Sequence, residues 1–240
     1  MIRRTALYMA SGLLALLLSG CAGKVQQPIS INDGFWQNNT KVIGIAMTNV
    51  PNADTHLVGA DCLLCIAVAS GANSSLTTHI KTLPTTDVAK LDVMVAKLLE
   101  EKGFKVKVIK RPLVTKKLPD FSAKVENSPA KDFTGFKADG VDVLLVVDIQ
   151  MLGAYRTYAA YVPTSDPQAI FNGRAYMVDL ENNSYLWYKS VNQLKAADVA
   201  WDEPPSFPGL TKAYYEVVES GLTAMKEDFV KQTVLAKIQP

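Results

Sequence analysis

The order of apolar and polar positions predicts a domain that begins with a strand, a helix and a strand. Residues 41–47 form a short apolar run rich in β-branched side chains, which is typical of a buried strand. From about residue 84 to 102, apolar residues return on one helical face, and Gly103 provides a stop. Residues 104–109 then alternate as a strand does.

The second half of the chain predicts an antiparallel meander. Residues 141–149 are almost continuously apolar and β-branched, so we expect them to form a central strand covered on both faces. Further strands are predicted at 154–162, 169–180 and 185–193. The turn-rich residues 181–184 join the last two into a hairpin.

Two other stretches complete the predicted architecture. Residues 110–140 hold prolines and glycines among charges and predict a long excursion with at most a short helix at 130–137. Apolar residues at helical spacing from 210 to about 238 predict a long C-terminal helix. The predicted fold class is therefore α+β, with helices packed on a mixed, mainly antiparallel sheet in one domain over residues 40–240.

The N-terminus has the pattern of a secretory signal at residues 1–20. Arg3 and Arg4 precede an apolar run that is too short to span a bilayer permanently. The following Leu18-Ser-Gly-Cys21 resembles the lipobox of signal peptidase II substrates. That resemblance implies cleavage before Cys21 and attachment of diacylglycerol and an N-acyl chain to it. The alternative is an ordinary signal peptide with a chance cysteine.

A lipid on Cys21 would hold residues 21–39 as a lipidated N-terminus and tether between the membrane and the domain. Ala22, rather than Asp, follows the anchor, which is similar to lipoproteins sorted to the outer membrane. We therefore expect an outer-membrane protein whose domain faces the periplasm. Phe35 and Trp36 are costly to leave in water, so we expect them to dock on the domain or at the membrane interface.

The charge of the chain does not predict a nucleic-acid partner. The formal net charge is +2, and Arg3 and Arg4 of the predicted signal account for it. Binding to nucleic acid needs basic residues clustered on the folded domain. We expect no nucleic-acid partner and no cofactor beyond the covalent lipid.

Cys62 and Cys65 form a C-x-x-C pair in a compartment that oxidises thiols. A disulfide is the simplest interpretation, because residues three apart in a turn lie close enough for one. Inert thiols and a redox pair are alternatives. A further alternative is a tetrahedral metal site made by Cys62, Cys65 and the two histidines, His56 and His79.

Residues 57–69 form an apolar segment in which Asp61 is the one charged residue. The segment is too short to cross a membrane as a helix. The favoured interpretation is a buried helix or loop beside the first strand. The alternative is an exposed apolar lip used for self-association or membrane contact.

The sequence contains no G-x-S-x-G motif, P-loop or dinucleotide fingerprint, so we predict that the protein is not an enzyme. Four aspartates are placed at predicted strand ends, where turn capping is the usual role. They are Asp139, Asp142, Asp148 and Asp179.

Aromatic residues suggest a second binding alternative. Tyr155, Tyr158 and Tyr161 line a predicted strand with Arg156 and could bind a glycan or another small ligand. Such residues are more often cross-strand packing pairs.

The predicted hairpin contains a sequence motif that resembles one in other envelope proteins. Tyr176-Met-Val-Asp-Leu180 followed by Tyr185-Leu-Trp187 resembles the hairpin of the curli secretion lipoprotein, of lipoprotein activators of penicillin-binding proteins, of the Tol propeller protein's amino-terminal domain and of a Neisseria-type lipoprotein family. Asn183-Ser184 replaces the Thr-Gly of that group, and residues 56–80 have no counterpart in it. The resemblance implies a non-catalytic accessory or assembly lipoprotein that binds an envelope partner or self-associates.

Overall fold

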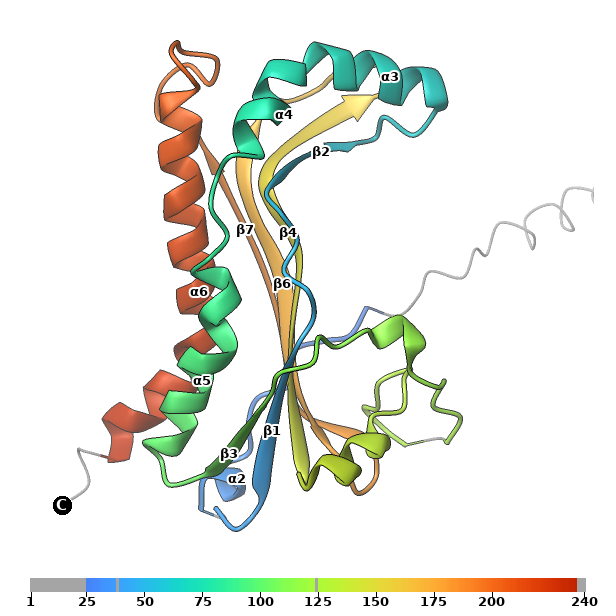
Figure 1. Cartoon of the computed structure of the whole chain (residues 1–240), viewed down its shortest axis with the longest axis vertical. Coiled ribbons are helices and arrows are strands. Elements are labelled where there is room, and N and C mark those ends of the chain that lie inside the picture. Colours follow the sequence, from blue (N-terminus) through green and yellow to red (C-terminus); the bar gives the residue numbers. More distant parts are fainter. Residues whose placement is uncertain (1–24, 38, 124, 237–240) are drawn as a thin grey trace, which may run out of the picture.

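The computed structural model describes residues 25–37, 39–123 and 125–236. Seven strands form one mixed sheet with the order β3-β1-β4-β6-β7, and β2 and β5 also pair with β4. Helices α5 and α6 cover one face of this sheet (Figure 1). The predicted α+β class is confirmed. The predicted signal and Cys21 lie outside the described residues.

The strand, helix, strand start is confirmed. β1 (Val42–Met47) lies parallel to β3 (Lys105–Ile109), and α5 (Leu91–Glu100) is the last helix of the long connection between them. The helix is shorter than predicted, because the 3-10 turn η1 (Val88–Lys90) precedes it. Gly103 ends the connection with a φ of +84°, a conformation that favours glycine.

The predicted central strand is confirmed as β4 (Val143–Ala159), which lies antiparallel to β6 (Gln168–Asp179). β7 (Ser184–Ala196) completes the meander. The separate strand predicted at 154–162 is wrong, because β4 continues through Gly153 to Ala159 and only then turns into the short β5 (Val162–Pro163).

Gly153 marks a close approach between strands. It has a φ of +122°, and a Cβ atom there would lie 2.1 Å from the carbonyl oxygen of Asp54. That oxygen belongs to β2 (Asp54–Val58), a strand the sequence did not predict, which pairs in parallel with the second half of β4. The glycine therefore permits β2 to join the sheet.

The long helix is confirmed as α6 (Pro208–Ala236), which packs on β6 and β7. Gly221 lets the helix approach the sheet, since a Cβ there would lie 2.4 Å from the ring of Phe171. Phe229, fully buried, packs against the ring of Trp187. The main core lies between the sheet and the helices α5 and α6.

The 110–140 excursion covers the opposite face of the sheet. It contains the two 3-10 turns η2 (Thr115–Lys117) and η3 (Thr134–Asp139), the second close to the predicted short helix. Phe133 and Phe136 from this segment pack on Tyr176 and its neighbours to form a second, smaller core.

The described N-terminal residues lie against the domain. Ile29 pairs with Tyr188 of β7, and α2 (Asp33–Gln37) follows. Phe35 stacks on Phe104, and Trp36 contacts Phe229, so the predicted docking of these two aromatics on the domain is confirmed. Ile29, Phe35 and Trp36, within the predicted tether range of 21–39, therefore contact the domain.

Candidate interaction surface

Two helices lie across the end of the sheet that is formed by β2 and the last residues of β4 (Figure 1). They are α3 (Leu63–Ala72) and α4 (Ser74–Ile80), joined with a bend of 72°. The segment 57–69, for which the sequence favoured a buried helix or loop, runs from the end of β2 through most of α3 and ends before α4.

That prediction of burial is wrong for α3. Cys65 and Ala69 are its buried residues, and every other residue of the helix is exposed. Leu63 is 90% exposed and Leu64 67% exposed. Ile66 and Val68 are also exposed. The helix packs along one narrow stripe, because Cys65 and Ala69 are one turn apart and both are small.

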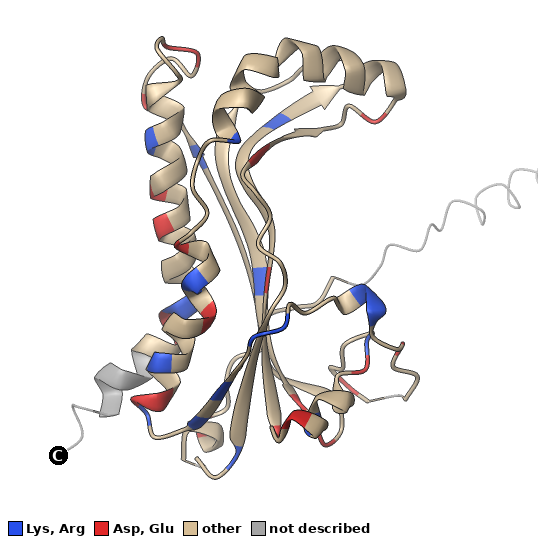
Figure 2. Cartoon of the chain, in the orientation of Figure 1, with Lys and Arg blue, Asp and Glu red and all other residues tan. Residues whose placement is uncertain are grey.

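We call this surface the apolar tip and define it by exposed apolar residues of α3 and of the strand ends beneath it. Neither α3 nor α4 contains Asp, Glu, Lys or Arg, and Figure 2 shows both helices without a coloured residue. Monomeric proteins seldom expose contiguous apolar surface without a use for it. The tip comprises Val58, Leu63, Leu64, Ile66, Val68, Tyr161 and Val162.

The tip is held in place by a small core and a buried polar hub. Cys65 and Ala69 pack with Ala60 and Tyr158. At the bend, the buried Asn73 amide donates to the carbonyl of Ala69 and to the hydroxyl of Tyr158. Arg156 donates to the Asn73 side-chain oxygen at 3.0 Å. The tip is thus fixed relative to β4 before it meets any partner.

The favoured disulfide between Cys62 and Cys65 is present at the start of α3. The backbone N–H of Cys65 donates to the Cys62 sulfur at 3.0 Å, so a half-cystine occupies the N-cap position. Ser, Thr, Asp or Asn usually fills this position and brings a polar oxygen to it. α3 therefore begins with an apolar cap.

The structure does not bring the four residues of the alternative metal site together. His56 Nε2 lies 3.1 Å from the carbonyl oxygen of Leu152, and His79 Nε2 lies 2.7 Å from the hydroxyl of Thr211. Within residues 25–37, 39–123 and 125–236, no group of three or more His, Cys, Asp or Glu side chains is placed to hold a metal ion. Cys62 and Cys65 are already bonded to each other.

Of the three tyrosines considered for ligand binding, Tyr158 supports the tip. Tyr158 is buried under α3 and accepts from Asn73, while Arg156 stacks over the ring of Trp201. Tyr155 lies opposite His56 in the sheet, and Tyr161 is exposed at the β4–β5 turn. The packing role that the sequence favoured describes Tyr158 well.

Two of the four aspartates, Asp142 and Asp179, lie at strand ends as predicted, whereas Asp139 is a correction because it is the last residue of η3. Asp142 accepts from the backbone of Val42, and Asp179 accepts from the backbone of Glu181 in the hairpin turn. Asp139 binds Arg111, whose hydrogen bond lowers the pKa of the aspartate carboxyl.

Asp148 is a correction, because it lies inside β4 rather than at a strand end. Its carboxylate accepts hydrogen bonds from Arg174 on β6 and from Thr48. It therefore joins β1, β4 and β6 on the half-buried face instead of capping a turn.

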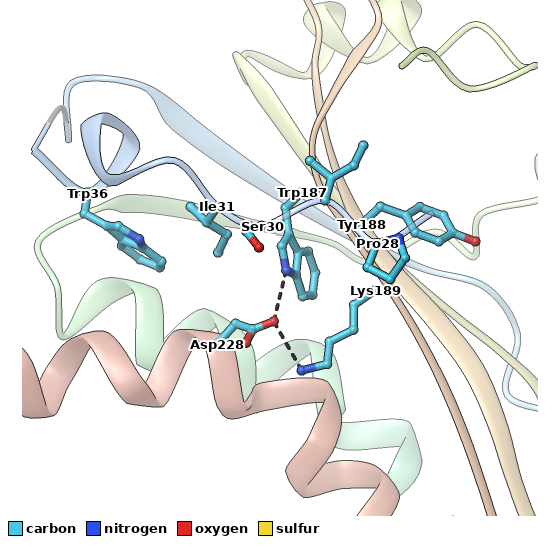
Figure 3. Close-up of a pocket in the computed structure, with 9 residues that line it drawn as sticks. Pro28, Ser30, Ile31, Trp36, Trp187, Tyr188, Lys189 and Asp228 are labelled. Carbon is cyan, nitrogen blue, oxygen red and sulfur yellow. Dashed lines mark hydrogen bonds and ion pairs between the residues drawn. The ribbon is translucent and has the colours of Figure 1, made fainter. Parts of the chain in front are cut away.

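A pocket of about 310 Å³ lies between the N-terminal segment, β7 and α6 (Figure 3). Asp228 on α6 accepts from the indole of Trp187 at 3.1 Å and from Lys189 at 3.2 Å. Pro28, Ile31 and Trp36 form the opposite wall (Figure 3). The charged groups of this pocket bind one another, which fits a role in joining α6 to β7.

The described residues include no single helix that is long and apolar enough to cross a membrane. By length and composition alone, the bent pair α3–α4 passes the same test as a broken span. Leu76 and Ile80 of α4 are buried in the domain, so the exposed apolar side chains of this pair belong to α3.

A scan against protein-family models and a search of curated proteins found no match. Among solved structures, the chain is similar to PelC from Paraburkholderia phytofirmans, described as a dodecamer, at 11% identity and a TM-score of 0.33, covering 82% of this chain and 96% of PelC. It is also similar to protein XCC0632 from Xanthomonas campestris, at 12% identity and a TM-score of 0.32, covering 85% and 95%. For lipoprotein GNA1162 from Neisseria meningitidis the identity is 14%, the TM-score 0.27 and the coverage 75% and 96%.

Likeness at this level says nothing about the function of this chain. No specific link to the curli secretion lipoprotein, the Tol propeller protein or the activators of penicillin-binding proteins is shown, so that resemblance stays a prediction. The function proposed below rests on the residues of the chain itself.

Proposed function

We propose that this chain is a non-catalytic, lipid-anchored protein of the outer membrane whose domain faces the periplasm and acts by docking its apolar tip on another component of the envelope. The predicted lipidation of Cys21 supplies the anchor. The observation that carries the docking role is the exposure of α3, an uncharged helix in which Leu63 is 90% and Leu64 67% exposed.

Because the apolar side chains of α3 stay in water, the free chain does not gain the free energy that their burial would provide. Fully burying a leucine side chain is worth about 1.5–3 kcal/mol, and this gain is not realised for Leu63 and Leu64 in the free chain. Most of the large apolar side chains in the rest of the domain lie in two cores under α5, α6 and the 110–140 excursion. A surface that gains free energy when covered, on a domain otherwise well packed, is the pattern of a docking site.

The tip is also rigid enough to bind without first folding. The disulfide closes the first turn of α3, and the Asn73 hub fixes its last turn to β4. A preorganised surface loses little conformational entropy on association. The sequence features of a disordered docking segment are absent from residues 57–80, which carry few charges and no proline.

Hydrogen exchange of α3 in intact envelopes and in the purified full chain tests the docking role. We expect the amides of residues 66–72 to exchange more slowly in the envelope, while those of α5 exchange equally in both. Equal exchange of α3 in both samples would contradict docking.

The anchor is tested separately by fractionation. The Cys21→Ser variant should leave the membrane fraction, while the natural chain should stay with the outer membrane. Retention of the natural chain at the inner membrane would overturn the proposed location.

A further inference from the structure

We infer that the apolar tip docks on a lipid bilayer, and specifically on the membrane leaflet that holds the predicted anchor at Cys21. This inference rests on the proposed docking role and names the partner of the same surface.

The first argument is how much of the circumference of α3 is exposed. The exposed positions of the helix lie on every side except the stripe formed by Cys65 and Ala69. A folded protein partner, including a second copy of the chain, covers one side of a helix and leaves the flanks in water. Acyl chains enclose an inserted helix on all exposed sides, so a helix that is apolar almost all round matches lipid.

The second argument is the absence of a polar border. Protein interfaces place polar and charged residues around an apolar centre. Among residues 57–80, all of which the structure describes, Asp61 and His79 are the residues that can carry charge. His79 is half-buried beside Thr211 at the far end of α4, so the flanks of α3 have no ring of charges to pair with a protein.

The third argument concerns the leading end of the helix. Leu63 and Leu64 lie in its first turn, directly beside the disulfide that replaces a polar N-cap. The cap therefore adds no polar side chain to this end, where the exposed Asp61, one residue before the cap, is the one charged residue. Ten residues of α-helix are about 15 Å long, half the thickness of a hydrocarbon core, so α3 inserts into one leaflet and does not cross.

The fourth argument is the position of the anchor. Val25, the first described residue, lies beside residues 125–128 of the excursion. Both the excursion and α3 extend to the side of the sheet away from α5 and α6 (Figure 1). Cys21 precedes Val25 by four residues, which span at most about 14 Å in any conformation. A membrane on this side can therefore hold the lipid of Cys21 and receive the tip at once.

The test places a tryptophan on the tip of the full lipidated chain. Leu64→Trp is reconstituted into phosphatidylcholine vesicles with and without brominated acyl chains, and Val93→Trp on α5, a position 59% exposed, is the matched control. Because an inserted apolar side chain reaches about 5–10 Å below the surface, we expect brominated lipid to lower the added emission of Leu64→Trp by about twofold and to leave that of Val93→Trp unchanged.

A loss variant checks that α3 itself drives the insertion. Adding Ile66→Ser and Val68→Ser to Leu64→Trp should abolish the quenching, since apolar area drives insertion. Raising the salt concentration should not weaken the quenching in the Leu64→Trp chain, because α3 carries no charge to be screened.

The other outcomes separate the two proposals. If brominated lipid does not quench Leu64→Trp but its emission shifts to the blue with protein concentration, a second copy covers the tip; the bilayer inference fails and docking stands. If the emission stays that of an indole in water in vesicles, at high concentration and in intact envelopes, both proposals fail.

Discussion

α6 and α3 are both rich in apolar residues, yet one covers the core and the other faces solvent. The apolar residues of α6 recur at helical spacing, and its buried members, among them Leu210, Tyr214 and Phe229, form a stripe against β6 and β7. α3 has no polar face, and its own sheet takes up only Cys65 and Ala69. Periodicity thus shows which side of a helix the chain itself will cover, and apolar residues outside that stripe must be covered from elsewhere or remain exposed.

The largest loss of stability should follow from a substitution in the core beneath α6. Phe229→Ala removes a fully buried ring that packs 5.0 Å from Trp187 and 6.4 Å from Trp36, measured between ring centroids. We expect it to lower the free energy of unfolding by about 3–5 kcal/mol, because it leaves a cavity. Urea denaturation measures the change, and a loss below about 1 kcal/mol would show that α6 does not depend on this contact.

The disulfide should matter less and only locally. Replacing both Cys62 and Cys65 by serine reopens a four-residue loop, which in the chain-entropy model costs about 2 kcal/mol. Hydrogen exchange should become faster in the first turns of α3 and stay unchanged in α6. Faster exchange in both helices would show that the tip and the main core unfold as one unit.

Ionisation of Tyr214 on α6 should lower the free energy of unfolding at alkaline pH. Its hydroxyl donates to the carbonyl of Pro84 at 2.9 Å, and burial raises its pKa to about 12. Because the folded chain holds this proton more tightly than the unfolded chain does, the stabilisation is complete below pH 10 and is lost between about pH 10 and 12.

Tyr214→Phe should therefore lower stability by about 1 kcal/mol at neutral pH and reduce the alkaline loss. Denaturant titrations across pH 8 to 12 measure both effects. Tyr185→Phe on β7 should also reduce the alkaline loss, since burial raises the pKa of Tyr185 to about 12 as well. An unchanged alkaline loss in Tyr214→Phe would assign the effect to other groups.

The smallest change in stability should come from the tip. Leu63→Ser alters a side chain that is 90% exposed, so we expect the free energy of unfolding to change by less than about 0.5 kcal/mol. The same variant should weaken docking of the tip, measured as the loss of α3 protection in the envelope. A large drop in the stability of the purified chain would contradict the exposure on which the comparison depends.

Much of the fold could be predicted because its signals are local. The β1–α5–β3 unit, the central β4 and the hairpin before β7 each have a periodic pattern bounded by turn residues. β2 was missed because Asp54–Val58 is short and mixes polar with apolar positions. The sequence predicted separate strands at 141–149 and 154–162, although Gly153 between them is the point at which β2 approaches β4. A close approach between distant segments leaves no local pattern.

The candidate site was predictable in composition but not in exposure. The sequence identified the uncharged segment around Cys62 and Cys65 and favoured both their disulfide and the burial of the segment. Burial failed because it depends on how much surface β2 and β4 offer to α3, and they offer room for two small side chains. The sequence does not show that Cys65 and Ala69 form the buried side of α3, because the other positions of the helix are also small or apolar.

The length of β4 sets the reach of the molecule. Its 17 residues, about 55 Å of strand, begin at Val143 in the main core, pass a shift of register between Ile149 and Met151, and reach Tyr158 beneath α3. It is hydrogen-bonded along this course to β1, β2, β5 and β6. Because one hydrogen-bonded strand joins the main core to the tip, the number of residues in β4 sets how far the tip lies from the centre of the domain.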